Sequence, residues 1–371
     1  MAVDTHTHVQ KLTVFLYPPV AALNMTDYRA QMTTCPHLLD IHAPLGHTKS
    51  QELTHGGMIM KRTKYPIHPD FKAWTNLNPP LNRTMLPMMQ KLMGLLFDWE
   101  KSTKDLAVER KIIPVGDGAS IRALWYVPKD VGKNAPCLVY YHGGGFALPA
   151  GPYHYNLARE YAQRARCGVL FVDYRLAPKY PFPTALEDCF AAYLWVLNQA
   201  GELGVDPDRV AVTGDSAGGE LSAAVCLMAQ ERGVAVPCGQ MLIYPATGAG
   251  RETQSMIKYT DTPICNSRDF EKYVSFYLPN PADEESIYAA PIKAESLAGM
   301  PAAYIETAEF DCLRDDGILY AERLRQFGVL VELHNTEGTM HAFDIVLDSP
   351  IVRNCVDRRI AFLNKVFADR R

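Results

Sequence analysis

A serine set between glycines, where a strand pattern meets a helical pattern, constrains the fold of this chain more than any other feature. The hexapeptide Gly-Asp-Ser-Ala-Gly-Gly at 214–219 follows a β-branched apolar run at 209–213 and precedes a helical pattern at 220–230. A sharp strand-to-helix turn needs small residues beside the serine, because its backbone is strained and passes close to neighbouring segments. The pattern predicts an elbow that presents Ser216 as a nucleophile; an ordinary glycine-rich turn is the alternative.

A glycine run lies upstream of this elbow. The residues His-Gly-Gly-Gly-Phe at 142–146 directly follow an apolar strand pattern at 137–141. Consecutive glycines leave their backbone N–H groups uncovered, so these groups can point at a substrate oxygen. Alone, the run would also fit a flexible turn or an anion-binding nest. Ahead of the elbow, it predicts an oxyanion hole.

The composition is that of an ordinary globular protein. The chain has 371 residues, of which 48% are apolar and 21% charged, enough for one large α/β domain or two average ones. Its net charge is −4, and no basic cluster contains interleaved aromatic residues, so we expect neither nucleic-acid binding nor electrostatic attachment to a membrane. No run of eighteen apolar residues is present, and no transmembrane helix is predicted.

The cysteines indicate a reducing compartment. There are nine, none in a CxxC pair, and several lie in apolar strand or helix patterns. This is typical of buried free thiols rather than of a disulfide framework or a zinc site, so we expect a cytoplasmic protein without a metal site. An apolar stretch at 12–23, interrupted by two prolines, leaves a signal peptide as the alternative.

Three regions follow one another along the chain. Residues 1–57 hold six of the eleven histidines and show weak periodicity, which predicts a poorly ordered extension. Residues 58–105 have a methionine-rich helical pattern, clearest at 82–97, whose place before the first strand favours a cap over the site. Residues 106–371 form the predicted catalytic domain, in which the long stretch at about 246–298 fits an inserted helical cap.

Strand and helix patterns alternate from residue 109 onward. This alternation predicts an α/β fold with a mostly parallel eight-stranded sheet and helices on both faces. The expected strands are 109–115, 121–127, 137–141, 168–173, 209–213, 239–244, 302–307 and 329–334. The expected helices are 153–166, 185–200, 217–232 and 315–327.

A serine hydroxyl becomes a good nucleophile only when a base takes its proton, and the base needs an orienting carboxylate. In a parallel sheet such groups lie on loops after the carboxyl ends of strands. His341 follows the last strand pattern on a loop flanked by small residues, whereas His334 lies inside that pattern. We therefore predict His341 as the base, with a structural histidine as the alternative.

The carboxylate is expected after the strand pattern at 302–307. Asp311 lies close to the strand end, where its side chain can project over the sheet. Asp315 and Asp316 fit the start of the next helix, whose positive end favours carboxylates. Glu309 is the runner-up. The resulting order, Ser216, Asp311 and His341, is the order expected for an α/β-hydrolase elbow.

These motifs together resemble those of the bacterial hormone-sensitive-lipase-like esterases, the family IV branch of the α/β-hydrolases. The resemblance covers roughly residues 60–371, and the first 57 residues have no counterpart in it. The matching segments are His-Gly-Gly-Gly at 142–145, Tyr-Arg-Leu-Ala-Pro at 174–178, Pro-Phe-Pro at 181–183, the elbow at 214–219, Asp-Cys-Leu-Arg-Asp at 311–315 and His-Ala-Phe at 341–343.

The resemblance implies roles for individual residues. It makes Ser216 the nucleophile, Asp311 the triad acid and His341 the base, under a cap formed by the N-terminal region and by residues after 239–244. It assigns the oxyanion hole to the N–H groups of three residues, Gly144, Gly145 and Ala217. Four residues of the two glycine motifs are expected to contact the substrate: Gly143, Phe146, Asp215 and Glu220.

Three positions depart from the family pattern. Glu220 stands where asparagine is common, Cys312 where proline is common, and Lys179 where glutamate is common. Glu220 is four residues past Ser216 and so lies on the same helix face as the elbow. Two hypotheses follow: Glu220 adds negative charge that disfavours anionic substrates, or it is a structural hydrogen-bonding residue, which is the favoured interpretation.

The sequence thus predicts a cofactor-free serine carboxylesterase for short- to medium-chain esters, with a small-molecule ester as its partner. A lipase for longer-chain acylglycerols is the first alternative, disfavoured because no membrane-surface helix is evident. A non-catalytic receptor on the same fold is the second, disfavoured because His341 is present. An exposed last strand at 329–334 permits a homodimer.

Overall fold

The computed structural model of the protein describes residues 64–76, 82–248 and 250–369. These residues belong to the second of the two units into which the chain divides, Met60–Arg371. The predicted extension at 1–57 and the histidines within it lie outside the described residues. The proposed domain boundaries therefore stay predictions.

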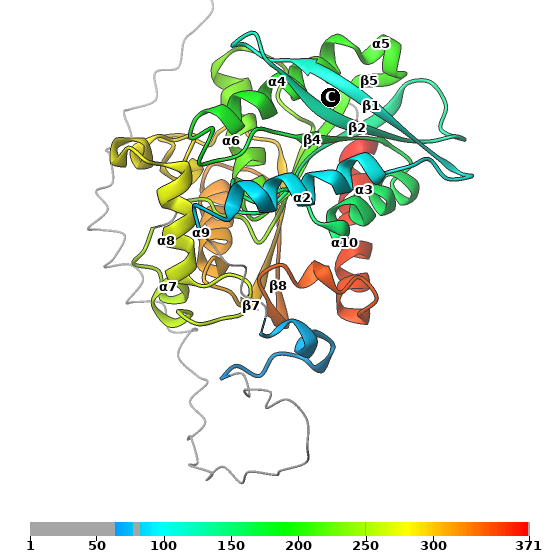
Figure 1. The fold of residues 1–371 in the computed structure, drawn as a ribbon. Coiled ribbons are helices and arrows are strands. Elements are labelled where there is room, and N and C mark those ends of the chain that lie inside the picture. The colour runs from blue at the N-terminus through cyan, green and yellow to red at the C-terminus, as the bar shows by residue number, and fades with distance from the viewer. Residues whose placement is uncertain (1–63, 77–81, 249, 370–371) are drawn as a thin grey trace, which may run out of the picture. The chain divides into compact units, whose positions relative to one another are not determined.

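Eight strands form one sheet in the order β1-β2-β4-β3-β5-β6-β7-β8. The strands are β1 (Leu106–Pro114), β2 (Ser120–Pro128), β3 (Ala135–Tyr141), β4 (Gly168–Asp173), β5 (Val205–Asp215), β6 (Gly239–Ile243), β7 (Ala302–Phe310) and β8 (Val331–Met340). Strand β2 runs antiparallel to both β1 and β4, and all later pairs are parallel. The prediction of a mostly parallel eight-stranded sheet is confirmed (Figure 1).

Helices cover both faces of this sheet (Figure 1). The longer ones are α2 (Leu86–Trp99), α3 (Pro152–Arg164), α4 (Thr184–Asn198), α6 (Ala217–Glu231), α8 (Ser267–Tyr277), α9 (Arg314–Gln326) and α10 (Pro350–Ala368). Short α5 (Ala200–Leu203) and α7 (Gln254–Lys258) and four 3-10 turns, Pro69–Trp74, Pro281–Glu285, Pro291–Lys293 and Phe343–Ile345, complete the described elements. No helix in the described ranges is long and apolar enough to cross a bilayer.

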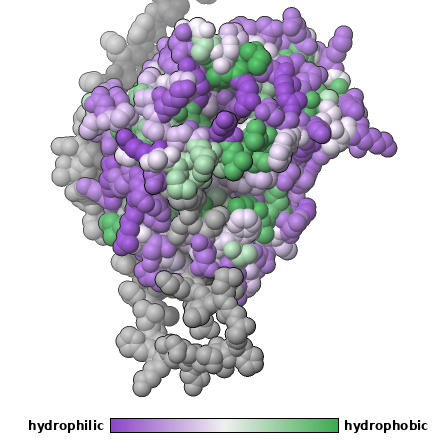
Figure 2. All heavy atoms as spheres, in the orientation of Figure 1, coloured by the Kyte–Doolittle hydropathy of each residue, from purple (hydrophilic) through white to green (hydrophobic). Residues whose placement is uncertain are grey.

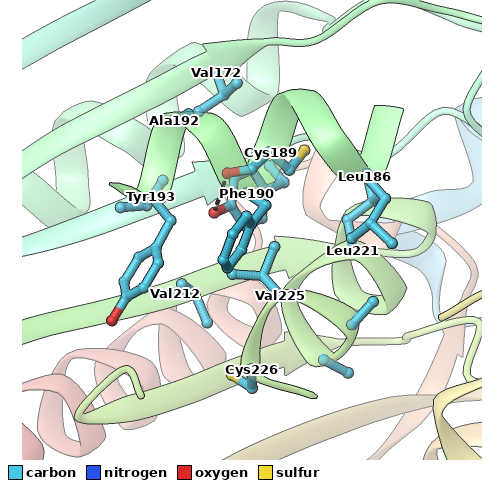
Figure 3. Packing of buried hydrophobic residues seen from close by; sticks show 14 of the residues in the cluster. Val172, Leu186, Cys189, Phe190, Ala192, Tyr193, Val212, Leu221, Val225 and Cys226 are labelled. Carbon is cyan, nitrogen blue, oxygen red and sulfur yellow. Dashed lines mark hydrogen bonds between the residues drawn. The ribbon is translucent and has the colours of Figure 1, made fainter. Parts of the chain in front are cut away.

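The core consists of two layers, one on each face of the sheet. Because successive side chains of a strand point to opposite faces, Val139 and Tyr141 of β3 pack with α4, α6 and α9, whereas Leu138 and Tyr140 pack with α3 and α10. Figure 3 shows the first layer, where Phe190 of α4 lies against Val225 of α6. Burial on both faces explains the continuous apolar runs of the central strands.

The C-terminal helix α10 is the main departure from the predicted elements. Its residues 350–368 include five charged side chains, and the arginine at 359 is fully buried in the core rather than exposed. Arg359 is paired with Glu306 of β7 at 2.6 Å and with Asp344 at 3.0 Å. A buried charge at a core position interrupts the apolar periodicity that identifies a helix in sequence.

Apolar side chains remain exposed on α2. The large ones are Met88, Leu92, Leu95 and Trp99, and Met85 at the N-cap of the helix is exposed as well. Figure 2 shows apolar residues gathered over this helix on the face that it presents, among a mostly hydrophilic surface.

Candidate active site

Ser216 occupies a strained elbow between β5 and α6. Its backbone has φ 54° and ψ −117°, a conformation rare for residues with a side chain. Its N–H donates to the carbonyl of Ile243 at 2.8 Å, which holds the turn against β6. A Cβ at Gly214 would collide with the backbone of Gly218, and one at Gly218 would collide with the carbonyl of Tyr141. The elbow thus requires glycine at both positions.

Strand register brings the three predicted catalytic side chains together. Phe310 at the end of β7 pairs with Met340 at the end of β8, so the next residue of each strand, Asp311 and His341, are neighbours. His341 Nδ1 lies 2.7 Å from Asp311 Oδ2, and His341 Nε2 lies 2.9 Å from Ser216 Oγ. All three residues are buried. The arrangement allows a proton to pass from the serine hydroxyl to the imidazole.

The other acidic candidates have different partners. Glu309 accepts a hydrogen bond from the N–H of Gly338 at 2.7 Å. Asp315 accepts one from the N–H of Ser255, and Asp316 one from the N–H of Gly248. The described residues therefore place Asp311, rather than these three carboxylates, against the histidine.

Two opposing effects set the protonation of His341. Burial disfavours the imidazolium, but the adjacent Asp311 charge, with smaller help from Cys265 and Asp215, raises the pKa of His341 to about 9. The ordinary histidine value of about 6.5 is therefore not the one expected here. Asp311 also receives the N–H of Leu313 on its other oxygen at 2.9 Å, which fixes the carboxylate that faces the histidine.

The glycine loop presents backbone amides beside Ser216. Gly144 has φ +123° and Gly145 φ +58°, both in the region that favours glycine. Ala217 is the first residue of α6, where an N–H group has no partner within its helix. Among the described residues no acceptor takes the N–H of these three residues, and all three line the same cavity as Ser216. They are available to a developing oxyanion.

Asp215 holds this loop in place. Its Oδ1 accepts from the N–H of Gly143 at 3.0 Å and from the Tyr140 hydroxyl at 3.3 Å. Its Oδ2 lies 3.1 Å from His154 Nε2 and accepts from the Tyr153 hydroxyl at 3.3 Å. Burial alone would raise the pKa of Asp215, but the histidine charge and these hydrogen bonds outweigh it and keep the pKa low. Asp215 therefore positions the loop, in addition to lying at the cavity wall where we expected it.

Glu220 is the second acidic side chain expected to contact the substrate. It lies one turn past Ser216 on α6 and belongs to the cavity wall. Its Oε1 is buried and has no hydrogen-bond partner among the described residues. Burial, reinforced by nearby Asp316, raises the pKa of Glu220 well above its ordinary value. The structure thus favours a neutral acid over the fixed negative charge of the first hypothesis, and it gives Oε1 none of the hydrogen bonds that the second, favoured hypothesis expected.

A cavity of about 810 Å³ opens over Ser216 and His341. Its walls include Met93 of α2 and Phe270, Tyr273 and Val274 of α8, so both predicted cap regions contribute to it. Gly143 and Phe146 also line it, and the ring of Phe146 stacks on that of Tyr277 with centroids 3.7 Å apart. These α8 side chains were expected only as part of a cap, because aromatic residues at helical spacing do not reveal which cavity they face.

No cluster of three or more metal-ligating side chains occurs among the described residues. His142 is fully buried, and its ring stacks on that of Tyr174 with centroids 4.4 Å apart. Burial, with the nearby charge of His154, lowers the pKa of His142 to about 4. This histidine is therefore a neutral structural support of the glycine loop.

Comparison with known proteins agrees with this geometry. A family model described as alpha/beta hydrolase fold matches residues 138–345. The carboxylesterase NlhH of Mycobacterium tuberculosis is 38% identical over 266 residues, covering 70% of this chain and 83% of that protein. The ethyl acetate hydrolase of Pseudomonas putida is 35% identical over 230 residues, covering 61% of this chain and 72% of that protein.

Solved structures give the same result. A bacterial heroin esterase aligns with a TM-score of 0.74 and 33% identity, covering 82% of this chain and 99% of its own. A hyperthermophilic esterase from Pyrobaculum calidifontis aligns with a TM-score of 0.72 and 34% identity, covering 81% and 99%. The chain therefore belongs to the alpha/beta hydrolase fold family, in its branch of hormone-sensitive-lipase-like carboxylesterases.

Proposed function

We propose that this carboxylic ester hydrolase acts through an acyl-enzyme on Ser216, with His341 as the base and Asp311 as the residue that orients it. The observation that carries the proposal is the continuous hydrogen-bonded line from Ser216 Oγ through the imidazole to Asp311, with distances of 2.9 and 2.7 Å. In the first half of the reaction, Ser216 Oγ attacks the ester carbonyl carbon while His341 Nε2 takes the hydroxyl proton.

The negative charge of the tetrahedral intermediate develops on the former carbonyl oxygen. The amides of Gly144, Gly145 and Ala217 are proposed to stabilise it. The C–O bond to the alcohol then breaks, and His341 returns its proton to the leaving alkoxide. In the second half, His341 takes a proton from water, the hydroxide attacks the acyl carbon, and the acid leaves as Ser216 regains its proton.

The proposed substrates are esters with short to medium acyl chains, bound under a cap formed by residues 58–105 and about 246–298. A cavity of about 810 Å³ with aromatic walls from α8 supports this choice. Longer acylglycerols are the alternative, for which the exposed apolar side chains of α2 are the relevant observation. Initial rates on p-nitrophenyl butyrate and palmitate separate the two: a higher kcat/KM on palmitate would favour the lipase.

The direct test is Ser216→Ala. Turnover of p-nitrophenyl butyrate should fall to background with the fold retained, and a fluorophosphonate probe should label only the unsubstituted protein. Persistent turnover would remove Ser216 from the mechanism. A purely binding role predicts no labelling of either protein.

The acid is tested with a matched pair of variants. Asp311→Asn should lower kcat by orders of magnitude, because the imidazole loses its orienting charge. Asp315→Asn, four residues along the same segment, should cost far less, because its carboxylate binds Ser255 and Arg314 instead. The reverse ranking would transfer the role to Asp315.

Two further expectations belong to this proposal. A cytoplasmic location is supported by eight buried free cysteines in the described residues. A homodimer is supported by β8, which lies at the edge of the sheet. Cell fractionation and analytical ultracentrifugation test them.

A further inference from the structure

Two buried thiols lie against each other beside the Asp311 turn, outside the proposed reaction. Cys265 is in the segment that joins α7 to α8, and Cys312 directly follows Asp311 after the end of β7 (Figure 1). Their sulfur atoms are 3.9 Å apart, at hydrogen-bonding distance for a thiol. The contact thus joins the cap region predicted at about 246–298 to the turn that carries Asp311, although the two cysteines are 47 positions apart in sequence.

Both thiols are held on fixed backbone. Ile264, just before Cys265, has φ +66°, which is unusual for a β-branched residue. The Thr262 hydroxyl donates to the carbonyl of Cys265 at 2.8 Å, and the Ser255 hydroxyl donates to the carbonyl of Cys312 at 2.8 Å. The proximity of the sulfurs therefore follows from anchored segments rather than from a freely rotating side chain.

The two thiols differ in access and acidity. Cys265 is part of the cavity wall, whereas Cys312 is fully buried, so a small reagent in the cavity meets Cys265 first. The thiol contact with Cys312 lowers the pKa of Cys265; burial opposes this and the His341 charge assists it. The same contact, together with burial, raises the pKa of Cys312. Cys265 is thus the better nucleophile of the pair.

We propose that Cys265 and Cys312 form an oxidation site that takes a hydroperoxide and closes an intramolecular disulfide between the cap and the Asp311 turn. The Cys265 thiolate attacks one peroxide oxygen, which breaks the O–O bond, gives a sulfenic acid and releases hydroxide. The sulfur of Cys312 then attacks the sulfenic sulfur, the S–O bond breaks, and the S–S bond forms. Overall, two thiols lose two electrons and hydrogen peroxide is reduced to two waters.

Closure of this bond should disturb the catalytic turn. The sulfurs must approach from 3.9 Å to about 2.0 Å. Cys312 is covalently next to Asp311, whose Oδ2 lies 2.7 Å from His341 Nδ1. A misplacement of about 1 Å can cost on the order of 10²-fold in rate, so we expect roughly a 10- to 100-fold loss of kcat/KM. This loss rests on the proposed role of Asp311, whereas the cross-link itself does not.

The test uses the full chain, reduced, desalted and treated with hydrogen peroxide, which catalase then removes. Free thiols are alkylated and unreduced peptides are mapped by mass spectrometry, while p-nitrophenyl butyrate turnover is compared with that of an untreated sample. We expect a 265–312 cross-link and a loss of activity that dithiothreitol reverses. After peroxide treatment, Cys265→Ser and Cys312→Ser should each retain the activity that the same variant had before treatment. Cys355→Ser should respond like the unsubstituted protein, because its sulfur contacts Thr336.

Absence of the cross-link would overturn the proposal, as would an equal loss of activity in Cys265→Ser, which would place the oxidation elsewhere. A cross-link with full activity would overturn its coupling to Asp311. The inactive Ser216→Ala variant should still form the cross-link, so failure of the proposed mechanism would not be mistaken for failure of the oxidation site.

Discussion

Asp215 and Glu220 lie on either side of Ser216, and both are buried, with 2% and 4% of their surface exposed. Their environments are opposite. Asp215 interacts with four polar groups, and its pKa is held below the ordinary value despite burial. No hydrogen bond reaches Oε1 of Glu220 from the described residues, and burial raises its pKa. Partners, rather than depth of burial, thus decide which of the two carboxylates is ionised.

The difference follows from the position of each residue on its element. Asp215 ends β5, and the pairing of Gly214 with Tyr141 places it beside the start of the glycine loop. Glu220 lies in the first turn of α6, where its side chain reaches the cavity wall and the neighbourhood of Asp316. A fixed negative charge therefore supports the oxyanion loop, while an acid that favours its neutral form lines the cavity.

Among variants of these two acids and their partners, Asp215→Asn should have the largest effect. The substitution removes a buried charge and leaves one acceptor oxygen where the carboxylate had two, so either Gly143 and Tyr140 or His154 and Tyr153 lose their acceptor and the loop is held less firmly. We expect a loss of about 3–5 kcal/mol in the free energy of unfolding and about 10²- to 10³-fold in kcat, as for a lost oxyanion donor. Thermal unfolding and p-nitrophenyl butyrate kinetics measure both. Exposed Asp208 on the same strand gives the control, Asp208→Asn, which should be neutral. If Asp215→Asn had the kinetics of the unsubstituted protein, a charged Asp215 would not be needed to support the oxyanion loop.

The pH dependence of activity sharpens the same comparison. His341 acts as a base only when deprotonated, and its pKa is raised to about 9, mainly by Asp311 against burial. Activity should therefore rise with pH through a limb well above 6.5, and Asp311→Asn should move that limb to lower pH. Glu220→Gln should leave it in place, because the main charges that act on His341 are those of Asp311, Cys265 and Asp215. Profiles of kcat/KM on an unactivated ester measure this; a flat profile down to pH 4 would contradict a histidine base.

Stability should respond to pH with opposite sign at the two acids. Because the pKa of Glu220 is raised in the folded protein, its carboxyl keeps a proton that the unfolded chain loses above about pH 4.5. The contribution of Glu220 to the free energy of unfolding is therefore lost as the pH rises through the pKa that it has in the folded protein. The pKa of Asp215 is lowered in the folded protein, so the contribution of Asp215 to the free energy of unfolding is lost as the pH falls through that pKa.

The stability of Glu220→Gln relative to the unsubstituted protein should therefore increase as the pH rises from 5 to 8. Denaturant unfolding at the two pH values is the measurement. If the difference in unfolding free energy between the two proteins were the same at pH 5 and pH 8, Glu220 would be ionised in the folded state at both pH values.

Spacing along the chain was enough to predict the sheet and to bring Ser216, Asp311 and His341 forward as candidates, because glycine elbows and strand ends have local signatures. The support given to the glycine loop by Asp215 could not be predicted in this way. It depends on the register between β3 and β5, which joins residues 72 positions apart, Gly143 and Asp215. The raised pKa of His341 likewise depends on burial and distance, which composition does not contain.

Helix α10 shows the same limit in the fold. Arg359 would be assigned to a solvent-facing position by its type, yet it is neutralised in the core by Glu306 and Asp344. A buried ion pair is recognisable only when both partners are known to approach each other, and these partners are 53 and 15 residues away in sequence.

The smallest effect should come from Tyr153→Phe, which removes a single donor to Asp215 Oδ2 at 3.3 Å and keeps the ring. His154 remains on the same oxygen at 3.1 Å, so the carboxylate stays charged and the Gly143 contact on Oδ1 is untouched. We expect no more than about 1 kcal/mol in unfolding free energy and less than about threefold in kcat. Tyr140→Phe, which removes the donor that shares Oδ1 with Gly143, is the matched comparison. If either variant cost as much as Asp215→Asn, the four partners would act as one cooperative unit, and the ionisation of Asp215 would depend on all of them rather than chiefly on its histidine.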